Sequence, residues 1–199
     1  MPAPERLFLL DGMALAYRAY YALITRPLIN SKGVNTSAIY GFVTALMKIL
    51  DDEKPEHVAV VFDTKGPTFR HRIFPAYKAT RQKMPEDMAS QLEKLKDVVR
   101  AFNVPSIELS GYEADDIIGT LARRAEKENV LTYMVTGDKD YMQLISPKIK
   151  MYKPGKAGGE VEVVDEMGVQ EKFGVRPEQV IDILGLIGDS SDNVPGVPG

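Results

Sequence analysis

GYEADDIIG, residues 111–119, is the stretch from which the organisation of this chain can be read. It sets the carboxylates of Glu113, Asp115 and Asp116 at the start of a predicted helix. The buried face of that helix is marked by apolar residues at helical spacing, Ile117, Ile118, Leu121, Ala122 and Ala125. Acids at a helix start gain about 0.3–1 kcal/mol each, which explains one or two of the three. Like charges about 4 Å apart repel by roughly 4 kcal/mol at an effective dielectric constant near 20, and a divalent cation most easily keeps such a cluster ionised.

The composition is that of a globular protein of 199 residues, long enough to bury a core within one domain. There is no Cys, and the two His are His57 and His71. This excludes a disulfide and argues against an ordinary zinc site, so any metal would be bound by oxygen. No apolar run approaches the roughly 20 residues of a membrane span, and residues 1–5 lack the pattern of a signal peptide. We therefore expect a cytoplasmic protein that uses no membrane.

The net charge of −3 argues at first against a nucleic-acid partner, which normally calls for a basic surface. Nine of the 28 acids, however, are the candidate metal ligands described below. Setting them aside leaves 19 acids against 25 bases, so the rest of the chain carries +6. A basic body around an acidic, metal-filled site suits a polyanionic substrate.

Short apolar runs predict four buried strands in an alternating β/α chain. They are residues 6–10 (RLFLL), 57–62 (HVAVVF), 105–109 (PSIEL) and 131–136 (LTYMVT). Asp11 follows the first run, Asp63 follows the second, and Asp138 and Asp140 follow the fourth. Asp138 could be a simple helix cap, but that leaves Asp140 unexplained. Because the carboxyl ends of neighbouring parallel strands meet at one edge of a sheet, we expect these acids to converge there.

Helical patterns fill most of the intervals between the runs. The predicted helices cover residues 13–23, 37–50 with Ser37 as the N-cap, and 86–102, and others begin near 113, 139, 165 and 177. Residues 148–153 and 160–164 predict a hairpin joined by the glycine-rich segment 155–159. The expected fold class is therefore α/β, with a mostly parallel central sheet between helical layers.

Two further acids, Asp189 and Asp192, follow the last predicted helix at a spacing that places them on one side. The full set of candidate ligands is Asp11, Asp63, Glu113, Asp115, Asp116, Asp138, Asp140, Asp189 and Asp192. Oxygen donors without Cys or His match Mg²⁺ or Mn²⁺, and their number exceeds what one octahedral ion uses. Two ions about 3.5–4 Å apart support phosphodiester hydrolysis.

Residues 64–85 contain no acid, and their basic side chains alternate with Phe69, Phe74 and Tyr77. The segment could be a solvated basic loop. We favour a mobile arch that binds phosphates, because aromatic and basic side chains together suit a single-stranded nucleic acid. Tyr17 and Arg18 could likewise stack on a base and contact a phosphate, although clustered tyrosines more often serve packing.

Several motifs, taken together and in order, resemble one known family over essentially the whole chain. They are LLDGMALAYRAYYAL, VVFD, FRH followed by YKATRQKMPEDM, GYEADDIIGTLA, TGDKDYMQL and GDSSDNVPGVPG. The family is the 5′-nuclease, or flap endonuclease-type, domain found at the N-terminus of bacterial DNA polymerase I. The resemblance implies a PIN-like three-layer fold with a basic helical arch at about residues 66–90. It also implies Mg²⁺-dependent cutting of 5′ flaps and 5′ ends of DNA, and of RNA primers, in replication and repair.

The resemblance also implies a role for each candidate residue. Asp11, Asp63, Glu113 and Asp115 would hold a first metal ion with Asp116 beside them, and Asp138, Asp140 and Asp192 would hold a second with Asp189 close by. Lys78 and Arg81 would be catalytic residues of the arch. The DNA-binding residues would be Tyr17, Arg18, Arg70, Arg72, Tyr77 and Lys83.

The domain boundaries follow from the same resemblance. Residues 1–188 would form the catalytic domain, and residues 189–199 would begin a helix–hairpin–helix that binds duplex DNA and is not completed here. The expected partners are branched or nicked DNA with a single-stranded 5′ end, and the polymerase portion of a parent chain. We expect a monomer.

Three other classes fit part of the pattern. A phosphatase with an aspartyl nucleophile also begins with a strand and Asp-Gly, but it needs a second acid where this chain has Met13. A PIN-type ribonuclease shares the fold and the acids, typically with a smaller ligand set and no arch. A DNA-binding module that has lost catalysis is disfavoured because no acid of the set is missing.

Overall fold

The computed structural model describes residues 5–155 and 159–198. Its centre is a sheet of six strands in the order β3-β2-β1-β4-β5-β6. The strands are β1 (Arg6–Asp11), β2 (His57–Val61), β3 (Ser106–Ile107), β4 (Leu131–Val135), β5 (Ile149–Lys153) and β6 (Glu162–Val164). Neighbouring strands are parallel except β5 and β6, which form an antiparallel pair. The mostly parallel sheet predicted from the sequence is confirmed.

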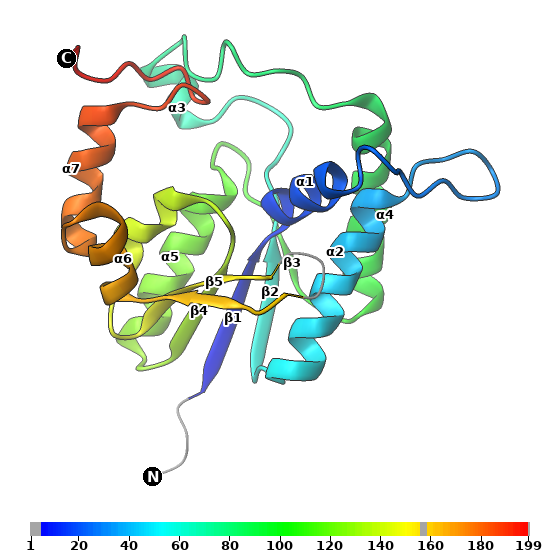
Figure 1. Ribbon diagram of the computed structural model, residues 1–199, viewed down its shortest axis with the longest axis horizontal. Coiled ribbons are helices and arrows are strands. Elements are labelled where there is room, and N and C mark those ends of the chain that lie inside the picture. Colours follow the sequence, from blue (N-terminus) through cyan, green and yellow to red (C-terminus); the bar gives the residue numbers. More distant parts are fainter. Residues whose placement is uncertain (1–4, 156–158, 199) are drawn as a thin grey trace.

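Helices cover both faces of this sheet (Figure 1). One layer contains α1 (Gly12–Ala22), α2 (Ser37–Lys48) and α4 (Glu86–Ala101), and the other contains α5 (Ala114–Lys127), α6 (Glu166–Phe173) and α7 (Pro177–Ile187). Successive side chains of β1 point to opposite faces of the sheet, so this strand contributes to the core under both helical layers. Phe8 and Leu10 pack against the first layer, and Leu9 packs against the second. None of the helices in the described part of the chain is long and apolar enough to span a membrane.

Four local predictions differ from the structure. Ser37 is the first residue of α2 and not its cap, because its hydroxyl accepts a hydrogen bond from Leu28 N–H at 2.9 Å. The third strand shortens to the two residues that pair with β2 at the sheet edge. The helix predicted near residue 139 is a short 3₁₀ helix, η2 (Lys139–Leu144). The fourth difference is that the arch is helical over only a short part of its length.

The β5–β6 hairpin forms as predicted, although most of its connection, at residues 156–158, lies outside the described residues.

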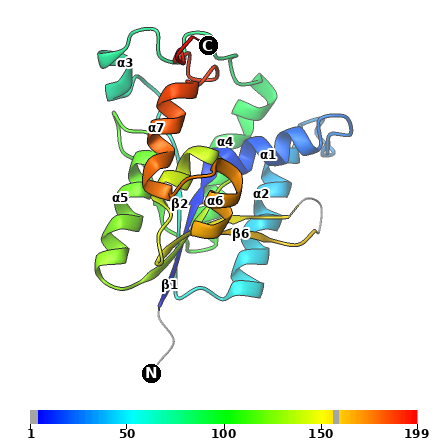
Figure 2. The ribbon, with the colours of Figure 1, turned by 60° about the vertical axis from the view of Figure 1, so that its left-hand side comes forward.

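The arch is helical only in α3 (Phe69–Ile73). Residues 74–85 form turns and extended chain, and they contain prolines at both ends, Pro75 and Pro85, which lack the N–H that a helix needs. This segment crosses the carboxyl end of the sheet from α3 to α4 (Figure 1). Figure 2 shows it beside the residues that follow α7, at the end of the molecule opposite the start of β1.

Two helical glycines give a matched test of packing. An added Cβ at Gly41 in α2 would lie 2.6 Å from Ala19 Cβ of α1, whereas at Gly185 in α7 it would meet nothing within 4 Å. We predict that Gly185→Ala stabilises the fold by about 0.5–1 kcal/mol through helix propensity. Gly41→Ala gains the same propensity but forces α1 and α2 apart, so it should lower the free energy of unfolding by about 1–3 kcal/mol. Urea unfolding of both variants measures this, and equal shifts would contradict the close packing of α1 on α2.

Candidate active site

A cleft of about 800 Å³ opens at the carboxyl end of the central strands. Eight of the nine nominated acids line it, namely Asp11, Asp63, Glu113, Asp115, Asp138, Asp140, Asp189 and Asp192. The ninth, Asp116, lines a neighbouring groove along α5. The structure thus brings together acids that arrive from separate parts of the chain.

The acids stand where strands end and helices begin. Asp11 closes β1, and its Oδ1 accepts a hydrogen bond from Ala14 N–H at 2.9 Å, which caps α1. Asp63 follows β2, and its Oδ1 accepts a hydrogen bond from Ala114 N–H at 2.8 Å. This bond ties the first turn of α5 to the segment that follows β2. Asp138 caps η2 by accepting from Asp140 N–H at 3.0 Å. Each of these carboxylates therefore has a structural contact in addition to any role in chemistry.

Burial perturbs the ionisation of several of these groups. It raises the pKa of Asp11 to about 6, against the hydrogen bond from Ala14 and with help from the charge of Asp63. It raises the pKa of Asp115 to about 7, although the charge of Arg70 opposes the shift. The pKa of Asp140 is also raised, first by burial and then by Asp138. Perturbed carboxyl groups gathered in one cleft are typical of a functional site.

Cations lie directly among the acids. Arg70 donates from Nη1 and Nη2 to the two carboxylate oxygens of Asp116, at 2.7 and 2.8 Å. Burial acts to raise the pKa of Asp116, but these bonds from Arg70 hold it below its usual value. Lys78 Nζ lies 2.8 Å from Glu113 Oε1 and 3.8 Å from Asp192 Oδ1. The cations offset part of the repulsion that the gathered carboxylates create.

Three hydrogen bonds and the Lys78–Asp192 ion pair join residues 74–85 to the loop after α7. Tyr77 is buried, and its hydroxyl is within 2.8 Å of Glu113 Oε2 and 2.9 Å of Asp192 Oδ2. Lys78 N–H donates to the Asp192 carbonyl at 2.9 Å, and Asn193 Nδ2 donates to the Ala76 carbonyl at 2.8 Å. Lys78 also has a φ of +56°, a left-handed conformation that a non-glycine residue keeps only where its surroundings enforce it.

The donor set suits a hard divalent cation. Every nominated ligand is a carboxylate, and Asp115 Oδ1 is buried without a hydrogen-bond partner among the residues described. Within residues 5–155 and 159–198, however, no group of three or more His, Asp or Glu side chains is placed so that it could hold an ion as it stands.

The residues nominated for DNA fall into two groups. Tyr17 lines the cleft, as do the nominated catalytic residues Lys78 and Arg81. The others do not line it, and they are Arg18, Arg70, Arg72, Tyr77 and Lys83. Of these, Arg72 and Lys83 are exposed, whereas Tyr77 is only 7% exposed, so its ring presents little surface for stacking.

Sequence reasoning missed several side chains of the cleft. Tyr141 is buried, and its hydroxyl donates to Asp11 Oδ2 at 3.1 Å. Lys139 Nζ lies 3.4 Å from Asp189 Oδ2, and Lys172 of α6 also lines the cleft. Tyr141 belongs to the motif TGDKDYMQL, so its neighbours Asp138 and Asp140 gave a signal for it. Lys172 is the one basic residue of α6, and a single lysine in a helix gives no such signal.

A family model described as 5′-3′ exonuclease, N-terminal resolvase-like domain, matches residues 6–174. The chain belongs to this family. DNA polymerase I of Bacillus subtilis (strain 168) is 48% identical over 200 residues, which cover 100% of this chain and 22% of that protein. DNA polymerase I of Bacillus caldotenax is 46% identical over 196 residues, which cover 98% of this chain and 22% of that protein. The chain therefore spans less than a quarter of the length of these two relatives.

One solved structure similar to this 5′-3′ exonuclease domain is the bacteriophage T5 flap endonuclease in a pseudo-enzyme–product complex with DNA and metal ions. The two share 20% identity and a TM-score of 0.76, over 98% of this chain and 71% of the other. At that identity the likeness concerns the fold alone. It agrees with the sheet order and the helical layers, and the PIN-like α/β fold predicted from the sequence is confirmed.

Asp11 yields a prediction for stability in metal-free buffer with EDTA. Because burial raises its pKa to about 6, the folded protein holds the proton more tightly than the unfolded chain, and ionisation destabilises the fold. This cost is absent below about pH 4, grows as the pH rises, and is complete above about pH 6. We predict that Asp11→Asn, which keeps the capping oxygen, raises the free energy of unfolding by about 2–3 kcal/mol at pH 7 and much less at pH 4.

Denaturant unfolding of wild type and variant across this pH range measures the effect. Asp182→Asn, which makes the same change at an exposed position of α7, is the matched control. A stability difference for Asp11→Asn that stays the same from pH 4 to pH 7 would contradict the assignment.

Arg70 and Arg72 form a matched pair on α3. Arg70 holds Asp116 through two hydrogen bonds, whereas Arg72 is exposed and makes no ion pair within the described part of the chain. Arg70→Ala removes the cation that pairs with Asp116 and leaves this carboxylate the hydrogen bond from Glu113 N–H, so we predict a loss of about 1–3 kcal/mol in the free energy of unfolding. Arg72→Ala should change it by less than about 0.5 kcal/mol. Thermal and urea unfolding compare them, and a similar small effect of both would show that the Arg70 pair is of no consequence for the fold.

Proposed function

We propose that this chain is a structure-specific 5′-nuclease that hydrolyses phosphodiester bonds at 5′ flaps and 5′ ends of DNA and at RNA primers. The observation that carries the proposal is the cleft in which eight carboxylates gather at the carboxyl end of a parallel sheet. Membership of the 5′-3′ exonuclease family supports it. So does the fold shared with a flap endonuclease that was solved with DNA and metal ions.

We propose Mg²⁺, or Mn²⁺ in its place, as the cofactor, with two or more ions bound. Asp11, Asp63, Glu113 and Asp115 would hold the first ion with Asp116 nearby, and Asp138, Asp140 and Asp192 would hold the second with Asp189 close by. Such ions would activate water for attack and would neutralise charge on the scissile phosphate. Asp115 Oδ1 is a free acceptor for this purpose, since it is buried without a partner among the described residues.

The basic residues of the cleft would act on the phosphate itself. Lys78 is held between Glu113 and Asp192 in a strained backbone conformation, so its ammonium is positioned before substrate arrives. Arg81 lines the same cleft. A cation placed where negative charge develops stabilises the transition state more than the bound substrate. We therefore assign Lys78 and Arg81 to catalysis.

The DNA contacts would be divided by exposure. Tyr17 would stack near the cut, and Arg18, Arg72 and Lys83 would contact the backbone of the DNA. Arg70 and Tyr77 are engaged with Asp116, Glu113 and Asp192, so they would position the acids rather than grip DNA. We further propose that residues 1–188 form the catalytic domain, with the arch at about 66–90, and that residues 189–199 open a helix–hairpin–helix. The polymerase portion seen in the relatives would be its partner, and the domain would act as a monomer.

A cleavage assay with a labelled 5′-flap duplex and Mg²⁺ tests the function. We predict that the wild type releases the flap, that EDTA abolishes cutting, and that Asp115→Ala lowers turnover by orders of magnitude without loss of fold, because it removes an oxygen ligand. Asp182→Ala makes the same change on exposed α7 and should retain activity. A wild type that binds the flap in Mg²⁺ but never cuts it would favour a DNA-binding module, and cutting of single-stranded RNA alone would favour a PIN-type ribonuclease.

Lys78 and Arg72 separate catalysis from binding. We predict that Lys78→Ala lowers the single-turnover cleavage rate by about 10²-fold or more and changes Kd much less, because its charge acts on the transition state. Arg72→Ala should instead raise Kd and reduce the salt dependence of binding by about one unit, with little effect on the rate at saturation. Equal effects on rate and Kd in both variants would mean that the arch is only a charged surface.

A further inference from the structure

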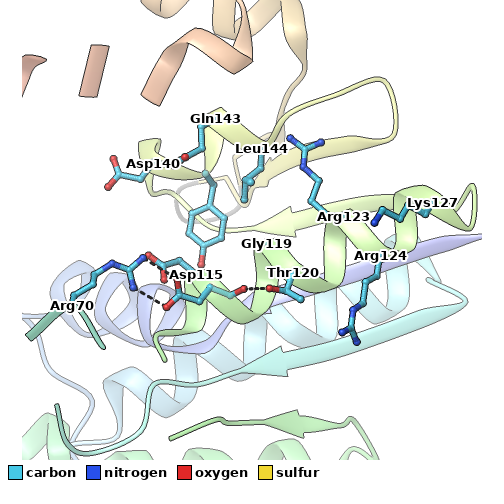
Figure 3. Close-up of a pocket in the computed structure, with 12 residues that line it drawn as sticks. Arg70, Asp115, Gly119, Thr120, Arg123, Arg124, Lys127, Asp140, Gln143 and Leu144 are labelled. Carbon is cyan, nitrogen blue, oxygen red and sulfur yellow. Dashed lines mark hydrogen bonds and ion pairs between the residues drawn. The ribbon is translucent and has the colours of Figure 1, made fainter. Parts of the chain in front are cut away.

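A second groove leaves the cleft and follows α5 (Figure 3). Its volume is about 530 Å³, with α5 forming one wall and Gln143 and Leu144 of η2 contributing to the other. Asp115, Asp140 and Tyr141 line both the cleft and this groove, so the two are continuous. Nothing in the proposed chemistry of the cleft uses the far end of the groove.

The groove changes charge along its length. At the cleft it begins with Asp115 and with Asp116, which is paired to Arg70. At the far end it is lined by Arg123, Arg124 and Lys127. The distance from Asp116 to Lys127 along the helix axis is roughly 16 Å at 1.5 Å per residue. A polyanion that enters from the carboxylates would therefore meet cations about three turns of helix away.

The cations at the far end differ in their partners. Arg123 pairs with Glu126 at 2.9 Å. Arg124 and Lys127 are exposed and make no ion pair with any residue in the described part of the chain. Residues three apart share one face of a helix, so their charges can serve successive groups of one ligand. Two unneutralised cations at the end of a formed groove are a suitable site for phosphate groups.

We propose that the α5 groove binds the single-stranded part of the substrate's 5′ strand, with its phosphates on Arg124 and Lys127. This inference rests on the proposed nuclease function. A volume of about 530 Å³ is typical of a site for one drug-sized molecule, which suits a nucleotide segment and not a duplex. Leu144, in the wall that η2 forms, offers an apolar contact for a base or sugar. Gly119 lies opposite it without a side chain, and a Cβ at that position would lie 3.1 Å from Leu144 Cδ1.

The test measures how affinity depends on the length of the 5′ single strand. Fluorescent duplexes with no tail and with tails of increasing length are bound in EDTA, where no cutting is expected. For each protein, the gain in affinity that the tail provides is the ratio of its affinity for the tailed duplex to its affinity for the tail-less duplex. We expect Arg124→Ala/Lys127→Ala to lose most of this gain. With the tailed duplex, its slope of log affinity against log salt should fall by roughly 1.4, or about 0.7 for each lost phosphate contact.

The matched control is Lys48→Ala/Lys94→Ala, which removes the same charge from exposed positions on α2 and α4. It should keep the full gain from the tail. A tail-dependent gain that is equally intact, or equally lost, in both double variants would overturn the proposal. If the wild type fails to cut a 5′ flap, the nuclease function fails first; if it cuts but the groove variant keeps its tail dependence, only the groove assignment fails.

The absence of cysteine allows a second, independent readout. Gln143→Cys places a unique thiol in the wall of the groove, and Lys48→Cys places one on α2. A tail that carries a disulfide-activated nucleotide should cross-link to the first and not to the second, and the same nucleotide placed within the duplex should cross-link to neither. Preferential cross-linking of the duplex nucleotide at Gln143→Cys would contradict the proposal.

Discussion

The repulsion among carboxylates at the carboxyl end of the sheet is the constraint around which this structure is arranged. Parallel strands deliver their last residues to one edge, so Asp11 and Asp63 cannot avoid each other once the sheet forms. Burial adds a second cost, and it raises the pKa of Asp11 and of Asp115. Local caps offset part of these costs. The N–H groups of Ala14 and Ala114 bond directly to the acids, so the helix starts that the fold needs also support the charges.

The segment between α3 and α4 depends on the same carboxylates. Residues 74–85 have no regular helix or strand, and their backbone contacts with the rest of the chain include that of Lys78 N–H with Asp192. The side chains of Tyr77 and Lys78 reach Glu113, more than one element away in the sequence. The acids therefore order the segment that covers them. A change of charge at Glu113 or Asp192 should be felt in the conformation of the arch as well as in the chemistry of the cleft.

The parts of this structure that could be predicted from sequence are those that local pattern determines. Apolar runs predicted the strands, and the acids that follow three of these runs predicted the edge at which Asp11, Asp63 and Asp138 meet. The partner with which each polar or charged side chain pairs could not be predicted from local pattern. Arg70 and Asp116 are 46 residues apart, and nothing local distinguishes an arginine that holds a carboxylate from one that meets a phosphate. The same limit applies to Ser37, whose hydroxyl serves a loop nine residues earlier instead of its own helix.

Net charge was the least informative property of the sequence, and the structure explains why. An overall charge of −3 describes a protein that should avoid polyanions, but eight of the 28 acids are concentrated in one cleft. Basic side chains such as Arg72, Arg124 and Lys127 are exposed outside it without acidic partners in the described part of the chain. Interactions between exposed charges fall off over about 8–10 Å at physiological salt, so a ligand responds to the local field and not to the sum. A polyanion approaching the far end of the groove along α5 therefore meets Arg124 and Lys127, although the molecule as a whole is acidic.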